Sequence, residues 1–220
     1  MSGARELGLR ERKKLATRRL IAETARRLFT ERGFERVPVA EIARAADVSE
    51  QTVFNYFPRK EDLVYWRLGS FEEELLAAIR DREEGTPVLV AFRRFILSQR
   101  GLLGEADPES RQLLAALARM IAESPALIAR EQQILAGYTA SLTALLAEET
   151  GAGDDDVRPA VAANALMGVH RGLIAYTRRR VLAGEAADPS LPGDVRAQAE
   201  RAFALLENGL GTYAVKASRG

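Results

Sequence analysis

The positions of its prolines constrain this chain more than any other feature of its sequence. A proline is tolerated in the first turn of a helix and is disruptive in the interior. The segments between the prolines are rich in Ala, Leu, Glu and Arg, which have high helix propensity, and none shows the apolar–polar alternation of a strand. We therefore expect an all-α fold. The eight prolines lie between or at the start of segments with helical apolar spacing: Pro38, Pro58, Pro87, Pro108, Pro125, Pro159, Pro189 and Pro192.

Apolar spacing and helix-end signals divide the chain into about nine helices. Gly33, for example, is the stop signal of the first helix. The predicted ranges are 11–32, 39–46, 50–56, 60–83, 87–103, 108–122, 125–150, 156–183 and 194–216.

Composition excludes several classes of protein. The 220 residues include no cysteine and one histidine, His170, which excludes disulfides, thiolate zinc sites and His-rich metal sites. The basic N-terminus has no apolar segment behind it, and no run of about 18 apolar residues could cross a bilayer. We expect a cytoplasmic protein with no membrane contact, no metal site and no cofactor.

Charge is distributed unevenly along the chain. The whole sequence has a formal net charge of +1, from 32 Lys and Arg against 31 Asp and Glu. Residues 1–65 contain 14 basic and 10 acidic side chains, a charge of +4, whereas the remainder contains 18 and 21, a charge of −3. A basic first quarter on a slightly acidic body is typical of a nucleic-acid-binding domain joined to a neutral one.

The most informative segment runs from Val39 to Leu63, VAEIARAADVSEQTVFNYFPRKEDL. Two short helices joined by a turn of three or four residues are the signature of a helix-turn-helix. Ser49 is a suitable N-cap for the second helix, in which Val53 and Phe57 lie one turn apart and would face the core. Hydrogen-bonding side chains are left for the outer face, where a recognition helix meets base edges and phosphates.

This segment belongs to a longer ordered set of elements. With that set, the sequence resembles the tetracycline-repressor (TetR) family of bacterial transcriptional regulators. The resemblance implies an N-terminal three-helix DNA-binding domain, 1–65, and a helical ligand-binding and dimerisation domain, 66–220. The elements that carry it are Arg18, Ala25, Leu28-Phe29, Gly33-Phe34, Ile42-Ala43, Ala46-Asp47-Val48-Ser49, Thr52-Val53-Phe54, Tyr56-Phe57 and Lys60-Glu61-Asp62-Leu63.

Four positions depart from the pattern of the resembled family. Asp47 replaces a glycine in the turn, which is permitted because aspartate tolerates the left-handed region. Gln51 stands where glycine is frequent and could add a base contact. Phe54 replaces a tyrosine whose hydroxyl touches a phosphate, so we expect Phe54 to pack inside the domain. Pro38 replaces a threonine, so that phosphate contact is expected from backbone N–H groups at the helix N-terminus.

The resemblance also implies which residues bind the operator, a double-stranded DNA site. Gln51, Thr52 and Asn55 are candidates for base contacts, Tyr56 and Lys60 for phosphate contacts, and Ser49 completes the interface. Four basic residues are expected to follow the DNA backbone or enter the minor groove as an N-terminal arm. A solvated helix face is the alternative for these four, which are Lys13, Lys14, Arg18 and Arg19.

In the resembled family the remaining helices bind a small-molecule effector. The predicted helix 60–83 would link the two parts and pack through Trp66, Leu68 and Phe71. We expect a hydrophobic or weakly polar effector, and a place in the core is the alternative for most of the candidate residues. The candidates are Phe92, Phe95, Met120, Tyr138, Leu142, Asn164, Met167, His170 and Arg171.

The last two predicted helices, 156–183 and 194–216, are the expected homodimer interface. Gly168 and Gly172 lie four residues apart, and small residues at that spacing let helices approach closely. The alternative is that they pack inside one subunit. The implied function is a regulator, most often a repressor, that binds a palindromic operator as a homodimer and is released by a small molecule.

Two other classes of function are rivals of this one. An all-helical enzyme with a catalytic serine would have to use His170, and no serine lies in a recognisable nucleophile turn, so we expect no catalytic residues. The run Asp154-Asp155-Asp156 cannot act as a helical metal–diphosphate motif, since consecutive residues do not share a helix face. The other rival is an architectural DNA-binding protein without a ligand.

Overall fold

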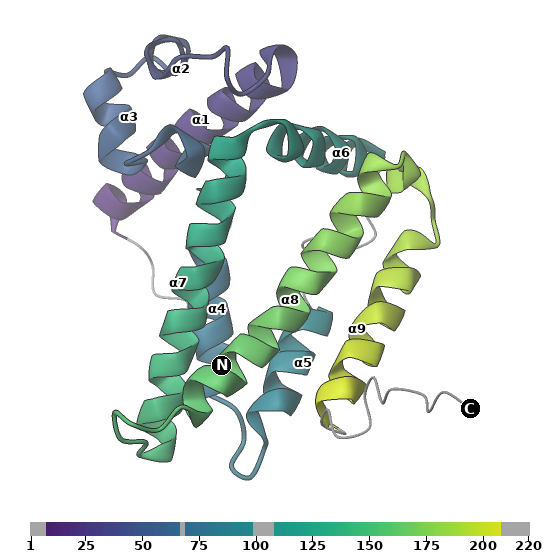
Figure 1. Ribbon diagram of the computed structural model, residues 1–220. Helices are drawn as coiled ribbons and strands as arrows, with labels where there is room; N and C mark the ends of the chain where they lie inside the picture. Colours follow the sequence, from purple (N-terminus) through teal and green to yellow (C-terminus); the bar gives the residue numbers. More distant parts are fainter. Residues whose placement is uncertain (1–7, 67–68, 99–107, 208–220) are drawn as a thin grey trace. The chain divides into compact units, whose positions relative to one another are not determined.

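The computed structural model describes residues 8–66, 69–98 and 108–207 (Figure 1). Within these ranges it contains nine α-helices and short 3₁₀ turns, and no strand, so the all-α prediction is confirmed there. The elements are α1 (Leu9–Arg32), α2 (Val39–Ala45), α3 (Glu50–Tyr56), η1 (Lys60–Leu63), α4 (Gly69–Arg80), α5 (Val88–Ser98), α6 (Pro108–Glu123), α7 (Pro125–Thr150), α8 (Arg158–Leu182), η3 (Glu185–Ala187) and α9 (Leu191–Glu207).

The single helix predicted over 60–83 is wrong. The chain forms the 3₁₀ turn η1, and α4 begins only at Gly69. The Asp62 carboxylate accepts from Arg59 N at 3.1 Å and from Arg130 Nε at 2.7 Å, which holds this turn by a contact from a distant part of the chain. Leu68 and the predicted ends 99–103 and 208–216 lie outside the described residues.

The chain divides into two compact units. The N-terminal unit comprises the chain up to Gly69 together with the segment Arg119–Glu131, here called the corner segment. The C-terminal unit comprises Ser70–Ala118 and the chain from Gln132 onward. The predicted division at residue 65 assigns the corner segment to the second domain, whereas by packing it belongs with the first unit.

In the N-terminal unit, α1, α2 and α3 enclose a core of apolar side chains. The Phe29 and Phe34 rings contact each other, with centres 5.1 Å apart. The helices turn their apolar residues inward because burial of such side chains stabilises the fold by about 1.5–3 kcal/mol each. The largest fully buried side chains of this unit are Ile21, Phe29, Ile42, Phe57, Leu63 and Leu127.

The corner segment is tied to the rest of the N-terminal unit by hydrogen bonds. The Tyr65 hydroxyl donates to Leu127 O at 2.9 Å in a buried setting. Ser124 Oγ donates to Glu35 Oε1 at 2.6 Å, and Ser124 is itself buried. With the Asp62–Arg130 ion pair, these contacts make the corner segment part of the same packed body.

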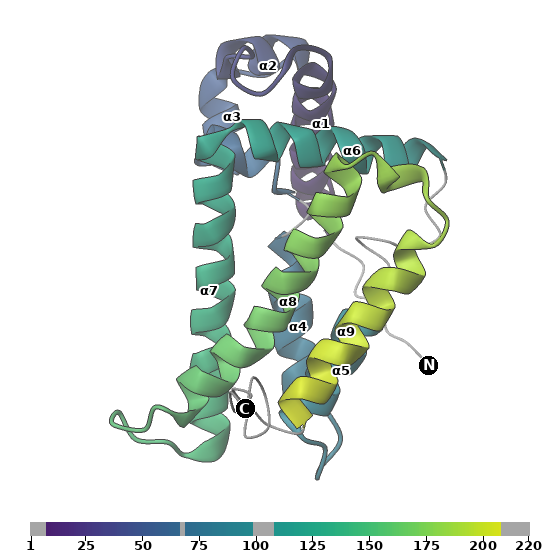
Figure 2. The same ribbon diagram turned by 45° about the vertical axis from the view of Figure 1, so that its right-hand side comes forward.

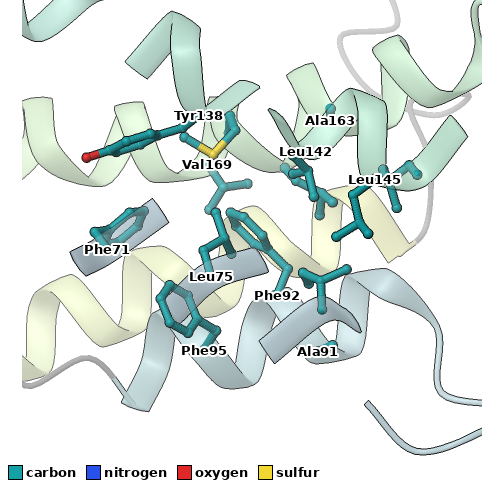
Figure 3. Close-up of a cluster of buried hydrophobic side chains, with 14 of the residues drawn as sticks. Phe71, Leu75, Ala91, Phe92, Phe95, Tyr138, Leu142, Leu145, Ala163 and Val169 are labelled. Atoms are coloured by element: carbon teal, nitrogen blue, oxygen red, sulfur yellow. The ribbon is translucent and has the colours of Figure 1, made fainter. Parts of the chain in front are cut away.

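In the C-terminal unit, five helices (α4, α5, α7, α8 and α9) contribute to one apolar cluster (Figure 3). Helices α8 and α9 lie side by side in both Figure 1 and Figure 2. Arg180 of α8 donates to Asp194 Oδ2 in the first turn of α9 at 3.1 Å and pairs with Glu185 of η3. The largest fully buried side chains of the cluster are Leu75, Ile79, Phe92, Leu142, Met167 and Phe203.

Two absences hold for the described ranges. No three histidine, aspartate or glutamate side chains are grouped there as metal ligands would be. No single helix in those ranges is long and apolar enough to cross a bilayer. The segment Gln112–Glu123 of α6 and the helix α7 meet that criterion only when they are taken together, and this pair is bent by 102°.

Candidate nucleic-acid interface

The turn between α2 and α3 orients the helix that is expected to read DNA. Asp47 has a φ of 53°, and it is the one described residue other than glycine with a positive φ. Aspartate therefore takes the left-handed conformation that the turn needs, as predicted. Val48 N then donates to Ala43 O at 3.0 Å, and Ser49 Oγ accepts from Thr52 N at 3.1 Å. Ser49 is the N-cap of α3, which confirms that prediction.

Two amide side chains lie on the exposed face of α3, and Glu50 in its first turn is exposed as well. Gln51 and Asn55 are both exposed, whereas Thr52 and Tyr56, each the next residue along, are half-buried. Gln51 Nε2 donates to Asn55 Oδ1 at 3.1 Å, which fixes the two amides against each other. Gln51 keeps its carbonyl oxygen and one N–H. An amide with those two groups free can pair with the N6 and N7 positions of adenine.

Phe54 lies on the same exposed face, which corrects the prediction that it packs inside the domain. Its side chain is 42% exposed, whereas Val53 and Phe57 are each 1% exposed. Val53 and Phe57 are four residues apart and take the core-facing positions of α3. Phe54 follows Val53 by about 100° around the helix axis and lies about 60° from Phe57, so it sits at the edge of the core-facing side and is partly exposed. Helical spacing from Val53 was the sequence signal for this placement.

Lys60 is held within the N-terminal unit through its ammonium group. Lys60 Nζ donates to Phe34 O at 2.6 Å and lies 4.3 Å from the centre of the Phe34 ring. Burial lowers the pKa of Lys60 more than the nearby Glu35 and Glu61 raise it. The phosphate contact that the resemblance implies for Lys60 stays a prediction, and it would use the N–H groups not bound to Phe34.

The four basic residues near the start of the chain lie within α1, so they form no extended arm. Lys13, Lys14 and Arg19 are exposed, and Arg19 takes part in an ion pair along the helix. The Arg18 guanidinium carbon lies 5.5 Å from the centre of the Phe57 ring, and its Nε is buried without a hydrogen-bond partner. Contact along the phosphate backbone is compatible with this helix, but insertion of these residues into the minor groove as extended chain is not.

The predicted effector residues fall into two groups. Met120 lies in the corner segment of the other unit. Asn164 is exposed on α8, where its Nδ2 donates to Ala160 O at 2.9 Å, and the half-buried Arg171 donates to Thr139 Oγ1 at 3.2 Å. The structure brings the others together in or against the apolar cluster of the C-terminal unit: Phe92, Phe95, Tyr138, Leu142, Met167 and His170.

Phe71 of α4, which the sequence analysis assigned only to packing, lies between several of these side chains. Its ring centre is 4.7 Å from that of His170 and 5.4 Å from that of Tyr138, with planes tilted by 21° and 23°. Phe95 meets the same ring edge-on at 5.3 Å (Figure 3). Burial, and then the charge of Arg171, lower the pKa of His170 to about 4, so its imidazole is neutral at neutral pH.

One face of α8 is exposed along the length of the helix. Val157, which precedes the helix, is 69% exposed and Val161 is 62% exposed. A Cβ added to Gly168 or Gly172 would meet nothing within 4 Å, so packing inside the subunit does not require glycine at either position. The exposed residues follow a helical spacing: Val157, Val161, Asn164, Gly168, Gly172, Ala175, Arg179 and Leu182.

Known proteins with similar sequences share this architecture. Residues 21–65, which include α2, the turn and α3, match the family described as bacterial regulatory proteins, tetR family. The chain is 30% identical over 155 residues to the HTH-type transcriptional regulator TcmR of Streptomyces glaucescens. The match covers 69% of this chain and 69% of TcmR.

Two solved structures show the same fold. NalD, the secondary repressor of the MexAB-OprM multidrug efflux pump in Pseudomonas aeruginosa, has a TM-score of 0.54 and 23% identity, covering 86% of this chain and 96% of NalD. A complex of SmeT with triclosan has a TM-score of 0.53 and 18% identity, covering 93% of this chain and 100% of SmeT.

Proposed function

Because the chain belongs to the tetR family of bacterial regulatory proteins and is a DNA-binding regulator of transcription, we propose that it is a ligand-released repressor. It binds a palindromic operator in the cytoplasm as a homodimer and leaves when a small apolar molecule binds. The observation that carries the proposal is the exposed face of α3, where Gln51 and Asn55 are held by their mutual hydrogen bond. Repression is the favoured sign because a dimer that occupies its site needs no further contact with the transcription machinery.

The exposed face of α8 supports pairing of two subunits. It combines apolar side chains at its start, Val157 and Val161, with the small residues Gly168 and Gly172 at its middle. Small residues on a helix surface allow a second helix to approach closely, and a two-fold axis would bring the same face of each subunit together. A dimer of this kind carries two α3 helices, one for each half-site of an operator whose half-sites are about 34–36 Å apart.

The aromatic group around Phe71 supports an apolar, ring-bearing effector. Tyr138, Phe95 and His170 surround the ring of Phe71, and the lowered pKa of His170 keeps its imidazole uncharged at neutral pH. A ring that entered this group would gain both apolar burial and ring–ring contact. Effector binding must then move Phe71, which lies two residues beyond the boundary of the N-terminal unit.

Helix α7 supplies a second connection for the release mechanism. It is one continuous helix that carries Tyr138, and its first turns belong to the corner segment. In that segment Leu127 O accepts from the Tyr65 hydroxyl, and Arg130 binds Asp62. Suppose that the effector binds better to a conformation in which the two α3 helices are displaced from the operator half-sites. It then lowers DNA affinity, and the coupling free energy is the same as that by which DNA lowers effector affinity.

The proposal is tested by footprinting the full chain on the DNA that flanks its own gene. We expect protection of a two-fold symmetric site, loss of protection in Gln51→Ala with Asn55→Ala, and no loss in Gln132→Ala, which removes an exposed amide outside α3. Compounds are then screened for release, with indole as a flat apolar probe. Protection of DNA without symmetry contradicts binding as a homodimer to a palindromic operator. Full protection by the double variant contradicts the assignment of α3, and DNA binding that no small molecule relieves contradicts the effector.

A further inference from the structure

Phe54 places a large apolar surface beside Gln51 and Asn55 on the exposed side of α3. The residue is 42% exposed, whereas Val53 within α3 and Phe57 at its C-cap are buried. It has no hydroxyl with which to bind a phosphate. When α3 lies in the major groove, the favourable contact for Phe54 therefore depends on which chemical groups the base edges present.

The thymine 5-methyl is the one sizeable apolar group that bases present in the major groove, where cytosine has only a C5–H. The remaining groups that identify the bases are hydrogen-bond donors and acceptors. A phenyl ring placed against a donor or acceptor removes its water without replacing the hydrogen bond, which is unfavourable. Against a methyl group the same ring buries apolar surface on both sides, which is favourable.

We propose that Phe54 contacts the 5-methyl group of a thymine in each operator half-site and thereby selects thymine at that position. The inference rests on the proposed function and adds a sequence preference to it. The hydrogen bond from Gln51 Nε2 to Asn55 Oδ1, 3.1 Å long, fixes the amides beside the ring and leaves Gln51 able to pair with adenine. Together these side chains make α3 a reader of A·T pairs.

Deoxyuridine provides the direct test because uracil lacks only the 5-methyl group of thymine. An operator is selected from random double-stranded DNA with the full chain, and the thymines of each half-site are then replaced one position at a time. Dissociation constants are measured at one fixed salt concentration. The loss of one buried methyl should weaken binding about fourfold per half-site, which corresponds to about 0.8 kcal/mol, and about 16-fold when both half-sites are changed.

Three variants separate the role of the ring from general effects. Phe54→Ala should bind thymine and uracil operators equally, because it has lost the surface that meets the methyl. Phe54→Tyr keeps the ring and should keep the uracil penalty. Ile128→Ala removes another exposed apolar side chain of the same unit, 36% exposed, and should behave as the unmodified chain does.

The outcomes distinguish this inference from the function on which it rests. If the chain binds a specific site at which no thymine is sensitive to uracil, or if Phe54→Ala keeps the penalty, the inference is overturned and the proposed function stands. If no specific DNA can be selected at all, the proposed function is overturned and the inference with it.

Discussion

Replacing Gly168 and Gly172 by leucine should separate the two subunits without unfolding either one. Both glycines are exposed on α8, and an added Cβ meets nothing within 4 Å at either position. Neither has a positive φ, so a larger residue fits the backbone without strain. Within one subunit the leucines therefore have space, and the test concerns only what lies across the face of α8.

The two expected effects have opposite signs. Glycine is less favourable than alanine in a helix interior by about 1 kcal/mol and leucine is close to alanine, so the two changes should stabilise α8 by roughly 1.5 kcal/mol. In a two-fold interface each substitution occurs twice, so four leucines enter a close contact, and each such insertion costs about 1–3 kcal/mol. A micromolar dimer is worth about 8 kcal/mol, so a total cost of about 4–12 kcal/mol raises its dissociation constant to about millimolar or beyond, and the subunits then separate at micromolar concentration.

Sedimentation velocity at micromolar concentration measures the oligomeric state, and circular dichroism checks that the helices remain. The double variant should sediment as a folded monomer, bind the operator more weakly, and melt at a temperature independent of protein concentration. Gly137→Leu is the matched control, because Gly137 is also an exposed helical glycine with nothing within 4 Å of an added Cβ, and it lies on α7. A double variant that still sediments as a dimer would refute pairing through this face.

Three further predictions concern charge, pH and capping. Lys13→Ala with Lys14→Ala should reduce the slope of log affinity against log salt by about 3.6 for the dimer, at about 0.9 per lost phosphate contact, and an unchanged slope would show that neither lysine contacts phosphate. The pKa of His170 is lowered to about 4 from an ordinary value near 6.5, so the free energy of unfolding should fall by up to about 3 kcal/mol as the pH drops between those values. His170→Phe should lack this part of the pH dependence in urea titrations at pH 7 and 4.5, and equal losses in both proteins would contradict it. Ser49→Ala should lower the free energy of unfolding by about 1 kcal/mol because Thr52 N loses its acceptor, whereas Ser49→Asp should not; equal urea midpoints for Ser49→Ala and the unmodified chain would contradict the cap.

Local sequence determined most of the helices and the recognition turn. Helices α3 and α7 begin and end where the sequence predicts, because Ser49 caps one and Pro125 starts the other. The left-handed Asp47 and the inward positions of Val53 and Phe57 were also predictable. Caps, turn conformations and helical periodicity depend on residues within about four positions of one another, so a single sequence contains their physical causes.

Only the tertiary structure decided how distant segments combine. The 3₁₀ turn at Lys60–Leu63 is held through Asp62 by Arg130, and the corner segment joins the N-terminal unit through the Tyr65 hydroxyl and Leu127 O. The grouping of effector candidates around Phe71, without Met120 or Asn164, is of the same kind. The Asp62–Arg130 and Tyr65–Leu127 contacts join residues more than 60 positions apart. In all these cases the partners are selected by packing and burial in three dimensions, which no local pattern encodes.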